Sequence, residues 1–222
     1  MGKKLFLTSA GLVRETRDTF LKLLSIAPNE ATVAFIPTAA DPEENKWFVD
    51  KDRELIDEIG MKIQEVDLKN ENETSLLQKL SPLQVIYVEG GNTFYLLNWV
   101  RKSGFDKVLP RLLGEGKIYI GVSAGSILVG PSIELSNWKH DWDKNIVNLK
   151  DLTGLNLVQF AISPHFIEKH RELLEQKSKT VNYPVVALND TQAILVNGRE
   201  IKIVGEGAKI TFNNFEEMEG KE

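Results

Sequence analysis

The chain has 222 residues, a formal net charge of −5, 42% hydrophobic residues and 27% charged residues. These values are typical of a globular protein that buries a substantial core, without the basic patch of a nucleic-acid-binding protein, and we expect one domain over residues 1–222 and no nucleic-acid partner. The sequence contains no cysteine, which excludes disulfides, thiolate nucleophiles and cysteine-ligated metal sites.

The first half of the chain alternates between short apolar runs and longer amphipathic segments. The apolar runs predict strands over Lys4–Thr8, Thr32–Pro37, Lys62–Asp67, Gln84–Val88 and Lys117–Val122. The segments between them predict helices over Val13–Ala27, Glu43–Gly60, Glu73–Leu80 and Thr93–Gly114, the last one broken near Ser103–Gly104. Strands that are apolar on both faces and alternate with helices indicate a buried, mostly parallel sheet. The pattern therefore predicts a three-layer α/β fold.

The second half of the chain is richer in strands. Ser132–Ser136 and Val158–Ser163 predict strands on either side of a polar loop, Trp138–Trp142, and Phe166–Lys179 predicts a helix. A compact β-rich part then covers Val185–Leu188, Ala193–Val196 and Ile201–Val204. The dipeptide Asn197–Gly198 predicts a type I′ hairpin between the last two strands.

A candidate nucleophile lies directly after the strand Lys117–Val122. Gly121 to Gly125 match the pattern G-x-S-x-G with Ser123 at its centre, and a short helix of small residues follows. A nucleophile elbow requires this strand-turn-helix setting, with the serine on a tight and strained turn. The N–H of Ala124, at the helix N-terminus, could then bind a developing oxyanion. The alternative is a tight turn with a helix-capping serine, and the strand before it favours the nucleophile.

A second glycine-containing turn follows the strand Gln84–Val88. Here Gly90 and Gly91 precede a predicted helix, and glycine allows the backbone to approach a ligand closely. The N–H of Gly90 or of Gly91 could supply the second oxyanion donor. Asn92 is also a suitable cap for the following helix, and both interpretations can hold together.

A serine nucleophile needs a base and an orienting acid. Among the three histidines, His165 follows an apolar strand, His140 lies in the polar loop, and His170 lies in a charged helix. His165 is the favoured base, because it lies at a strand end. Candidates for the acid are Asp141, Asp143, Asp151, Glu168 and Asp190. Asp190 follows the strand Val185–Leu188, which gives it a narrow advantage over Asp141 and Asp143.

Three motifs, Gly90–Phe94, Gly121–Ser126 and Ser163–Phe166, occur in this order over nearly the whole chain. The order and spacing of these motifs resemble those of the dipeptidase E family of serine peptidases, peptidase family S51. This family also contains the cyanophycinases. The resemblance implies a class I glutamine amidotransferase-like, flavodoxin-like fold. It also implies hydrolysis of short peptides with an N-terminal aspartate, without a metal or other cofactor.

Carried over to this sequence, the resemblance makes Ser123 the nucleophile, His165 the base and Asp190 the acid. It makes Gly91 and Ala124 the oxyanion donors. The order serine, histidine, acid differs from the order serine, acid, histidine of the α/β-hydrolases.

Substrate contacts are less well defined by the resemblance. Asn92 is a candidate contact. Arg171 is the nearest match to an arginine that binds the acidic side chain of the substrate in aspartyl dipeptidases. Glu168 and Glu175 lie three residues before and four residues after Arg171, so surface ion pairs on a helix are the alternative.

The leading hypothesis is a serine peptidase whose partner is a small peptide substrate. The alternatives are a cyanophycinase-like or other amide or ester hydrolase, and a non-catalytic binding protein on the same fold. The sequence shows neither an apolar leader after Met1 nor a run long enough to span a bilayer, so we expect a cytoplasmic protein without a membrane partner. Monomer and homodimer both stay open, as does a role of Trp138–Trp142 as a lid.

Overall fold

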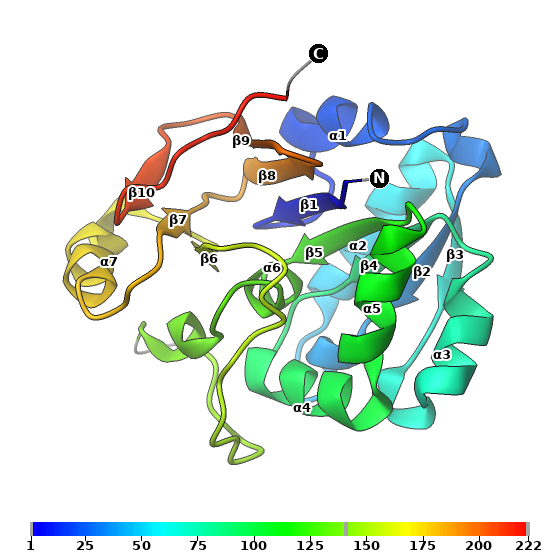
Figure 1. Ribbon diagram of the computed structural model, residues 1–222, viewed down its shortest axis with the longest axis horizontal. Helices are drawn as coiled ribbons and strands as arrows, with labels where there is room; N and C mark the ends of the chain where they lie inside the picture. The colour runs from blue at the N-terminus through cyan, green and yellow to red at the C-terminus, as the bar shows by residue number, and fades with distance from the viewer. Residues whose placement is uncertain (1, 140–141, 221–222) are drawn as a thin grey trace.

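The computed structural model describes residues 2–139 and 142–220 and contains a central sheet with strand order β3-β2-β4-β5-β1-β8-β9 (Figure 1). The first five of these strands are parallel to one another. They are β3 (Lys62–Glu65), β2 (Thr32–Ile36), β4 (Val85–Val88), β5 (Ile118–Val122) and β1 (Lys4–Thr8). The hairpin of β8 (Gln192–Asn197) and β9 (Glu200–Gly205) adds two antiparallel strands next to β1. The prediction of a mostly parallel α/β fold is confirmed.

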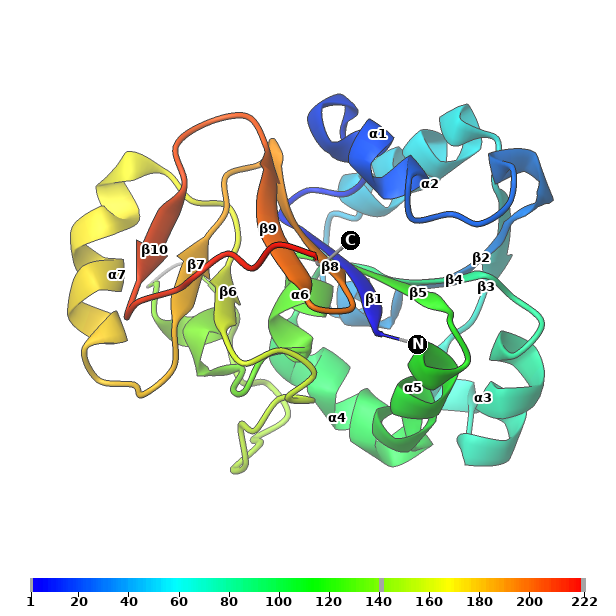
Figure 2. The same ribbon diagram turned by 45° about the horizontal axis from the view of Figure 1, so that its top comes forward.

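Helices cover both faces of this sheet, which explains why β1, β2, β4 and β5 are buried on both sides (Figure 2). On one face lie α1 (Arg14–Leu21) and α2 (Trp47–Ile59), which bury Phe20 and Ile56 against the strands. On the other face lie α3 (Glu73–Leu80), α4 (Thr93–Ser103) and α5 (Phe105–Gly114). Every residue of β4 and β5 is buried. These layers bring the carboxyl ends of the parallel strands together at one edge.

Glycine and proline set several of the helix ends. Gly104 has φ +76° and separates α4 from α5, which confirms the predicted break. The predicted helix Val13–Ala27 is too long, because α1 ends at Leu21. A 3₁₀ helix begins at Pro28, and Ala27 before it is extended, since a residue that precedes proline disfavours the helical region.

The C-terminal part forms two separate β structures instead of one compact run. Here β6 (Ala161–Ser163), β7 (Val185–Ala187) and β10 (Ile210–Phe212) make a second sheet, while β8 and β9 belong to the first. The predicted strand Val158–Ser163 is therefore reduced to β6, and β10 was not predicted. The predicted helix Phe166–Lys179 is a 3₁₀ helix over Glu168–His170 followed by α7 (Arg171–Ser178).

The predicted strand Ser132–Ser136 is wrong. Ser132 makes one isolated bridge to Thr153, and Glu134–Asn137 form a 3₁₀ helix. Two serine side chains bond to nearby backbone here: the Ser132 hydroxyl accepts the N–H of Glu134, and the Ser136 hydroxyl donates to the carbonyl of Ile133. Such local bonds compete with a strand ladder.

The predicted hairpin exists, but its turn is of another type. Asn197 is the last residue of β8 and pairs with Glu200, so Gly198 and Arg199 form the turn. Of these two, only Gly198 has a positive φ, +64°. A type I′ turn needs positive φ at both central residues, whereas a glycine at the first central position is typical of type II′.

No helix within the described ranges is long and apolar enough to cross a membrane. The organisation of residues 1–222 as one domain stays a prediction.

Candidate active site

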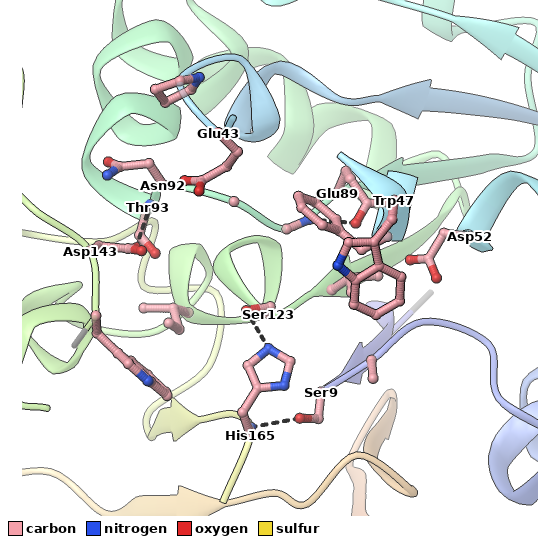
Figure 3. A pocket seen from close by; sticks show the side chains of 18 of the residues that line it. Ser9, Glu43, Trp47, Asp52, Glu89, Asn92, Thr93, Ser123, Asp143 and His165 are labelled. Carbon is pink, nitrogen blue, oxygen red and sulfur yellow. Dashed lines mark hydrogen bonds between the residues drawn. The ribbon is translucent and has the colours of Figure 1, made fainter. Parts of the chain in front are cut away.

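A pocket of about 640 Å³ opens at the carboxyl ends of β1, β4 and β5 (Figure 3). Its lining includes Ser9 after β1, Gly90 and Gly91 after β4, and Ser123 after β5. In open α/β sheets, ligands bind at this edge. His165 and Asp190, which come from the C-terminal part of the chain, close the lining from the side of the second sheet.

Ser123 stands on a strained turn between β5 and α6 (Ala124–Leu128), with φ +46° and ψ −104°. The glycines on either side have no room for a side chain. A Cβ on Gly121 would lie 2.6 Å from the backbone of Gly125, and a Cβ on Gly125 would lie 2.2 Å from the carbonyl oxygen of Val88. The Tyr119 hydroxyl also donates to the Gly125 carbonyl at 2.7 Å. Tight packing therefore keeps Ser123 in a conformation that an L-residue rarely adopts.

Ser123, His165 and Asp190 form a continuous chain of hydrogen bonds. The Ser123 Oγ lies 3.0 Å from Nε2 of His165, and the Nδ1 atom of the same ring lies 2.6 Å from Oδ1 of Asp190. The carboxylate favours a proton on Nδ1, which leaves Nε2 free to accept the serine proton. The hydrogen bond from His165 also holds the pKa of Asp190 below its ordinary value.

The other candidate acids are engaged elsewhere or are not described. Asp143 caps α4, Asp151 pairs with Arg101 at 3.1 Å, and Glu168 pairs with Arg171. His140 and Asp141 lie outside the described residues. Among the described candidates, the structure therefore brings His165 and Asp190 to Ser123.

Ser9 is a member of the site that sequence analysis missed. Its Oγ accepts the backbone N–H of His165 at 2.7 Å and donates to Oδ1 of Asp190 at 2.8 Å. His165 itself has φ +52°, so this contact holds a strained backbone in place. The only signal in the sequence is the position of Ser9 directly after the strand Lys4–Thr8, at the same edge as Ser123.

The structure decides between the two candidate oxyanion donors of the glycine turn, the N–H groups of Gly90 and Gly91. The N–H of Gly90 donates to the side chain of its neighbour, Oε1 of Glu89, at 2.8 Å. Within the part of the chain that the structure describes, the N–H groups of Gly91 and Ala124 have no acceptor. Gly91 has φ +127°, and a Cβ there would lie 2.3 Å from the carbonyl oxygen of Ala39. This position therefore requires glycine.

One wall of the pocket is held against the N-terminus of α4. Oδ2 of Asp143 accepts the N–H of Thr93 at 2.6 Å, and Nδ2 of Asn92 donates to the carbonyl of Lys144 at 3.0 Å. Oδ1 of Asn92 also accepts the N–H of Tyr95, so the predicted helix cap is confirmed. The Trp142 ring, in the same wall, meets the His165 ring edge-on with 6.3 Å between centroids.

Comparisons with known proteins identify the family of this chain. Residues 5–204 match the model of peptidase family S51. The chain belongs to peptidase family S51. It is 36% identical over 207 residues to an uncharacterised peptidase of Pasteurella multocida (strain Pm70), an alignment that covers 91% of this chain and 97% of the relative. It is 27% identical over 197 residues to a peptidase E of Nostoc sp., covering 84% of this chain and 78% of the relative.

Solved structures support the same assignment. A crystal structure of a protein from Listeria monocytogenes EGD-e described as peptidase E matches with a TM-score of 0.80 and 30% identity, covering 93% of this chain and 100% of the other. A peptidase from an acI-B1 actinobacterium has a TM-score of 0.68 at 14% identity, covering 98% and 97% of the two chains, and shares the fold. This S51 protein is thus a serine-type peptidase by its family.

The structure does not bring Arg171 to the pocket of this S51 peptidase. Its guanidinium forms an ion pair with Glu168 on the surface, and Arg171 is absent from the lining. The cations among the described lining residues are Lys51 and Lys144, which no sequence motif singles out. The structure describes no cluster of three or more His, Asp or Glu side chains that could hold a metal ion.

A buried lysine, Lys139, binds the backbone directly before His165. Lys139 is 4% exposed, and its Nζ donates to the carbonyl of Pro164 at 3.1 Å, directly before His165. The same atom lies 3.5 Å from the centroid of the Trp142 ring. Burial lowers the pKa of Lys139 to about 7, and the opposing attraction of Asp190 is smaller.

Proposed function

We propose that this S51 peptidase hydrolyses short peptides through an acyl-enzyme, with Ser123 as nucleophile, His165 as base and Asp190 as orienting acid. The observation that carries the proposal is the chain of contacts at 3.0 Å and 2.6 Å that joins the three side chains. Such a chain activates a hydroxyl that is otherwise a poor nucleophile. The strained turn of Ser123 supports the proposal, because a nucleophile elbow has this conformation.

In the first half-reaction the Ser123 Oγ forms a bond to the scissile carbonyl carbon while Nε2 of His165 takes the hydroxyl proton. The carbonyl electron pair moves to the oxygen, which the N–H groups of Gly91 and Ala124 stabilise. The C–N bond then breaks, and His165 gives its proton to the leaving amine. Water attacks the ester by the same route and releases Ser123. One oxyanion donor contributes roughly a hundredfold to a thousandfold to the rate in serine peptidases.

For the substrate we propose dipeptides with an N-terminal aspartate, as the family resemblance implies. Lys51 and Lys144 support this proposal, because they line the pocket and can attract a carboxylate. Arg171 has no role in it, since its side chain pairs with Glu168 outside the pocket. Asn92 also has no direct role, because both ends of its amide bind the protein itself.

Hydrolysis of a dipeptide panel tests the proposal. The panel contains Asp-Leu, Leu-Leu and a β-aspartyl dipeptide, and the proteins are the wild type, Ser123→Ala and Asp190→Asn. We expect the wild type to cleave Asp-Leu with a chelator present and Ser123→Ala to be inactive. Asp190→Asn should lose about a hundredfold to ten-thousandfold in kcat, because the wrong histidine tautomer is then favoured. Lys51→Ala and Lys144→Ala test the substrate side chain, with Arg171→Ala as their control.

Each outcome bears on a different part of the proposal. Cleavage of only the other peptides would keep the serine mechanism and remove the aspartate preference. A greater loss of Asp-Leu cleavage in Arg171→Ala than in the two lysine variants would contradict the assignment of the cations. Folded wild-type protein that cleaves no member of the panel and whose Ser123 does not react with a fluorophosphonate would contradict the triad mechanism.

A further inference from the structure

A buried acidic side chain lies directly before the glycine turn of the pocket. Glu89 follows β4 and is 0% exposed. Its Oε1 accepts the N–H of Gly90 at 2.8 Å, and its own N–H donates to the carbonyl of Ile36 at 3.0 Å. Gly90 in turn packs on the nucleophile, since a Cβ on Gly90 would lie 3.2 Å from Cβ of Ser123. The Glu89 carboxyl group therefore holds the Glu89–Gly90 peptide, which is the unit before the one that carries the Gly91 N–H.

The carboxyl group of Glu89 interacts with a second buried carboxyl group. Asp52 of α2 is 3% exposed and lies close enough to interact with Glu89, whose Oε2 is buried without a hydrogen-bond partner among the described groups. The Tyr87 hydroxyl donates to Oδ2 of Asp52 at 2.6 Å. Gly11 leaves room for this group, because a Cβ there would lie 2.3 Å from Oδ1 of Asp52. Both carboxyl groups are thus fixed by the core, and both line the pocket.

Two carboxyl groups can form a hydrogen bond only when one of them carries a proton. Burial raises the pKa of both Asp52 and Glu89, and this effect exceeds the opposing attraction of Lys51 on Asp52 and of Arg53 on Glu89. The negative charge that remains is stabilised by the Tyr87 hydroxyl at one end and the Gly90 N–H at the other. Loss of the shared proton would leave two adjacent buried carboxylates that repel each other.

We propose that Asp52 and Glu89 share one proton and form a positioning pair that fixes the Gly90 peptide, so that the Gly91 N–H stays free and oriented toward the oxyanion. This inference rests on the proposed function and extends it to two residues that do not touch the substrate. The pair also explains why Gly91 is the donor, since Glu89 already occupies the N–H of Gly90. A pair that only stabilised the fold would leave the chemistry unchanged in a folded variant.

Three variants test the pair. Glu89→Gln keeps an acceptor for the Gly90 N–H, and its amide can donate to Asp52 without a shared proton. Asp52→Asn also needs no shared proton. Glu89→Ala removes the support of the loop. A matched control is Glu71→Gln, which changes an acid whose side chain is 3% exposed and pairs with Lys79 outside the pocket lining.

Two readouts separate catalysis from stability: kcat and KM for the best peptide between pH 6 and 10, and the rate at which a fluorophosphonate probe labels Ser123. We expect Glu89→Ala to lose about tenfold to a hundredfold in kcat and in labelling rate, with KM changed by less than about threefold. Glu89→Gln and Asp52→Asn should keep most of the kcat at pH 7. In the wild type, loss of the shared proton should lower kcat at alkaline pH. In both amide variants this loss should disappear or move up by at least about one pH unit. Glu71→Gln should match the wild type in kcat.

Wild-type kcat and labelling in folded Glu89→Ala would overturn the proposal, and so would alkaline profiles of the two amide variants that coincide with the wild type. If Glu89→Ala does not fold, the two amide variants decide the question by their pH profiles. Wild-type protein that neither cleaves nor labels would contradict the proposed function itself, together with this extension of it. If only the proposal about the Asp52–Glu89 pair is wrong, the wild type will still cleave the peptide and label with the probe.

Discussion

The Oγ of Ser9 accepts the backbone N–H of His165 at 2.7 Å, although the two residues are 156 positions apart in the chain. The same hydroxyl donates to Asp190, so one side chain after β1 orders both partners of the proposed nucleophile. Ser9 is 0% exposed, and water cannot replace these bonds readily. The active-site loop of the second sheet is thereby attached to the edge of the first.

Ser9→Ala should therefore lower kcat by about tenfold, because an unsatisfied buried donor costs roughly 1–3 kcal/mol and His165 loses its support. KM should change little. Ser178→Ala is the control, since Ser178 is also buried and donates to the backbone, but on α7 away from the pocket lining. Steady-state kinetics of the two variants checks this, and equal kcat values would contradict a positioning role of Ser9.

Ser123 stores strain in its backbone, and glycine should release it. Ser123→Gly should be more stable than Ser123→Ala by about 1 kcal/mol, because only glycine adopts φ +46° and ψ −104° without steric cost. At a position without backbone strain, the glycine variant is less stable than the alanine variant. Thermal and urea unfolding of both inactive variants measures the difference. An alanine variant as stable as the glycine variant would show that the turn holds no strain.

Lys139 should make the free energy of unfolding depend on pH. Its pKa is about 7 in the folded protein against 10.5 as its ordinary value. Between these values the unfolded chain binds more protons, so the free energy of unfolding rises with pH across this window. Below about pH 7 the folded protein carries the full cost of the buried cation.

Lys139→Met removes this cost. The quantity of interest is the free energy of unfolding of Lys139→Met minus that of the wild type. We expect this difference to be larger at pH 6 than at pH 9 by more than about 1 kcal/mol, since one pKa unit corresponds to about 1.4 kcal/mol. Urea unfolding at the two pH values checks this, with the exposed Lys150 changed to Met as control. A difference that is the same at both pH values would contradict the assignment of Lys139 as a titrating group.

Asp143 should affect substrate binding more than chemistry, because it fixes the wall that contains Trp142 and Lys144. Asp143→Ala removes the acceptor of the Thr93 N–H and should cost about 1 kcal/mol of stability through loss of the helix cap. KM should rise severalfold with kcat changed by less than about threefold. Asp143→Asn, which retains an acceptor oxygen, should restore KM. An unchanged KM in Asp143→Ala would show that the wall does not contact the substrate.

Local sequence patterns predicted β1, β2, β4 and β5 because each of these strands is buried on both faces and forms a nearly continuous apolar run. The same patterns failed where neighbours decide the outcome. Ser132–Ser136 has the apolar alternation of a strand, yet its serines bond to the local backbone. The strands β7 and β8 follow one another in the chain but join different sheets, which no local pattern encodes.

The sequence by itself determined the α/β fold, the elbow at Ser123 and the candidates His165 and Asp190, because functional groups at the ends of parallel strands meet at one edge. The family resemblance already favoured Asp190 over Asp143 and Gly91 over Gly90. The tertiary structure supplied the physical reason, since these choices depend on which groups already have partners. The roles of Ser9, of Lys139 and of the Asp52–Glu89 pair follow from contacts between distant segments. A hydrogen bond requires a donor–acceptor distance within a few tenths of an ångström of its usual value. The packing of layers and loops sets this distance, whereas the spacing of residues along the chain does not.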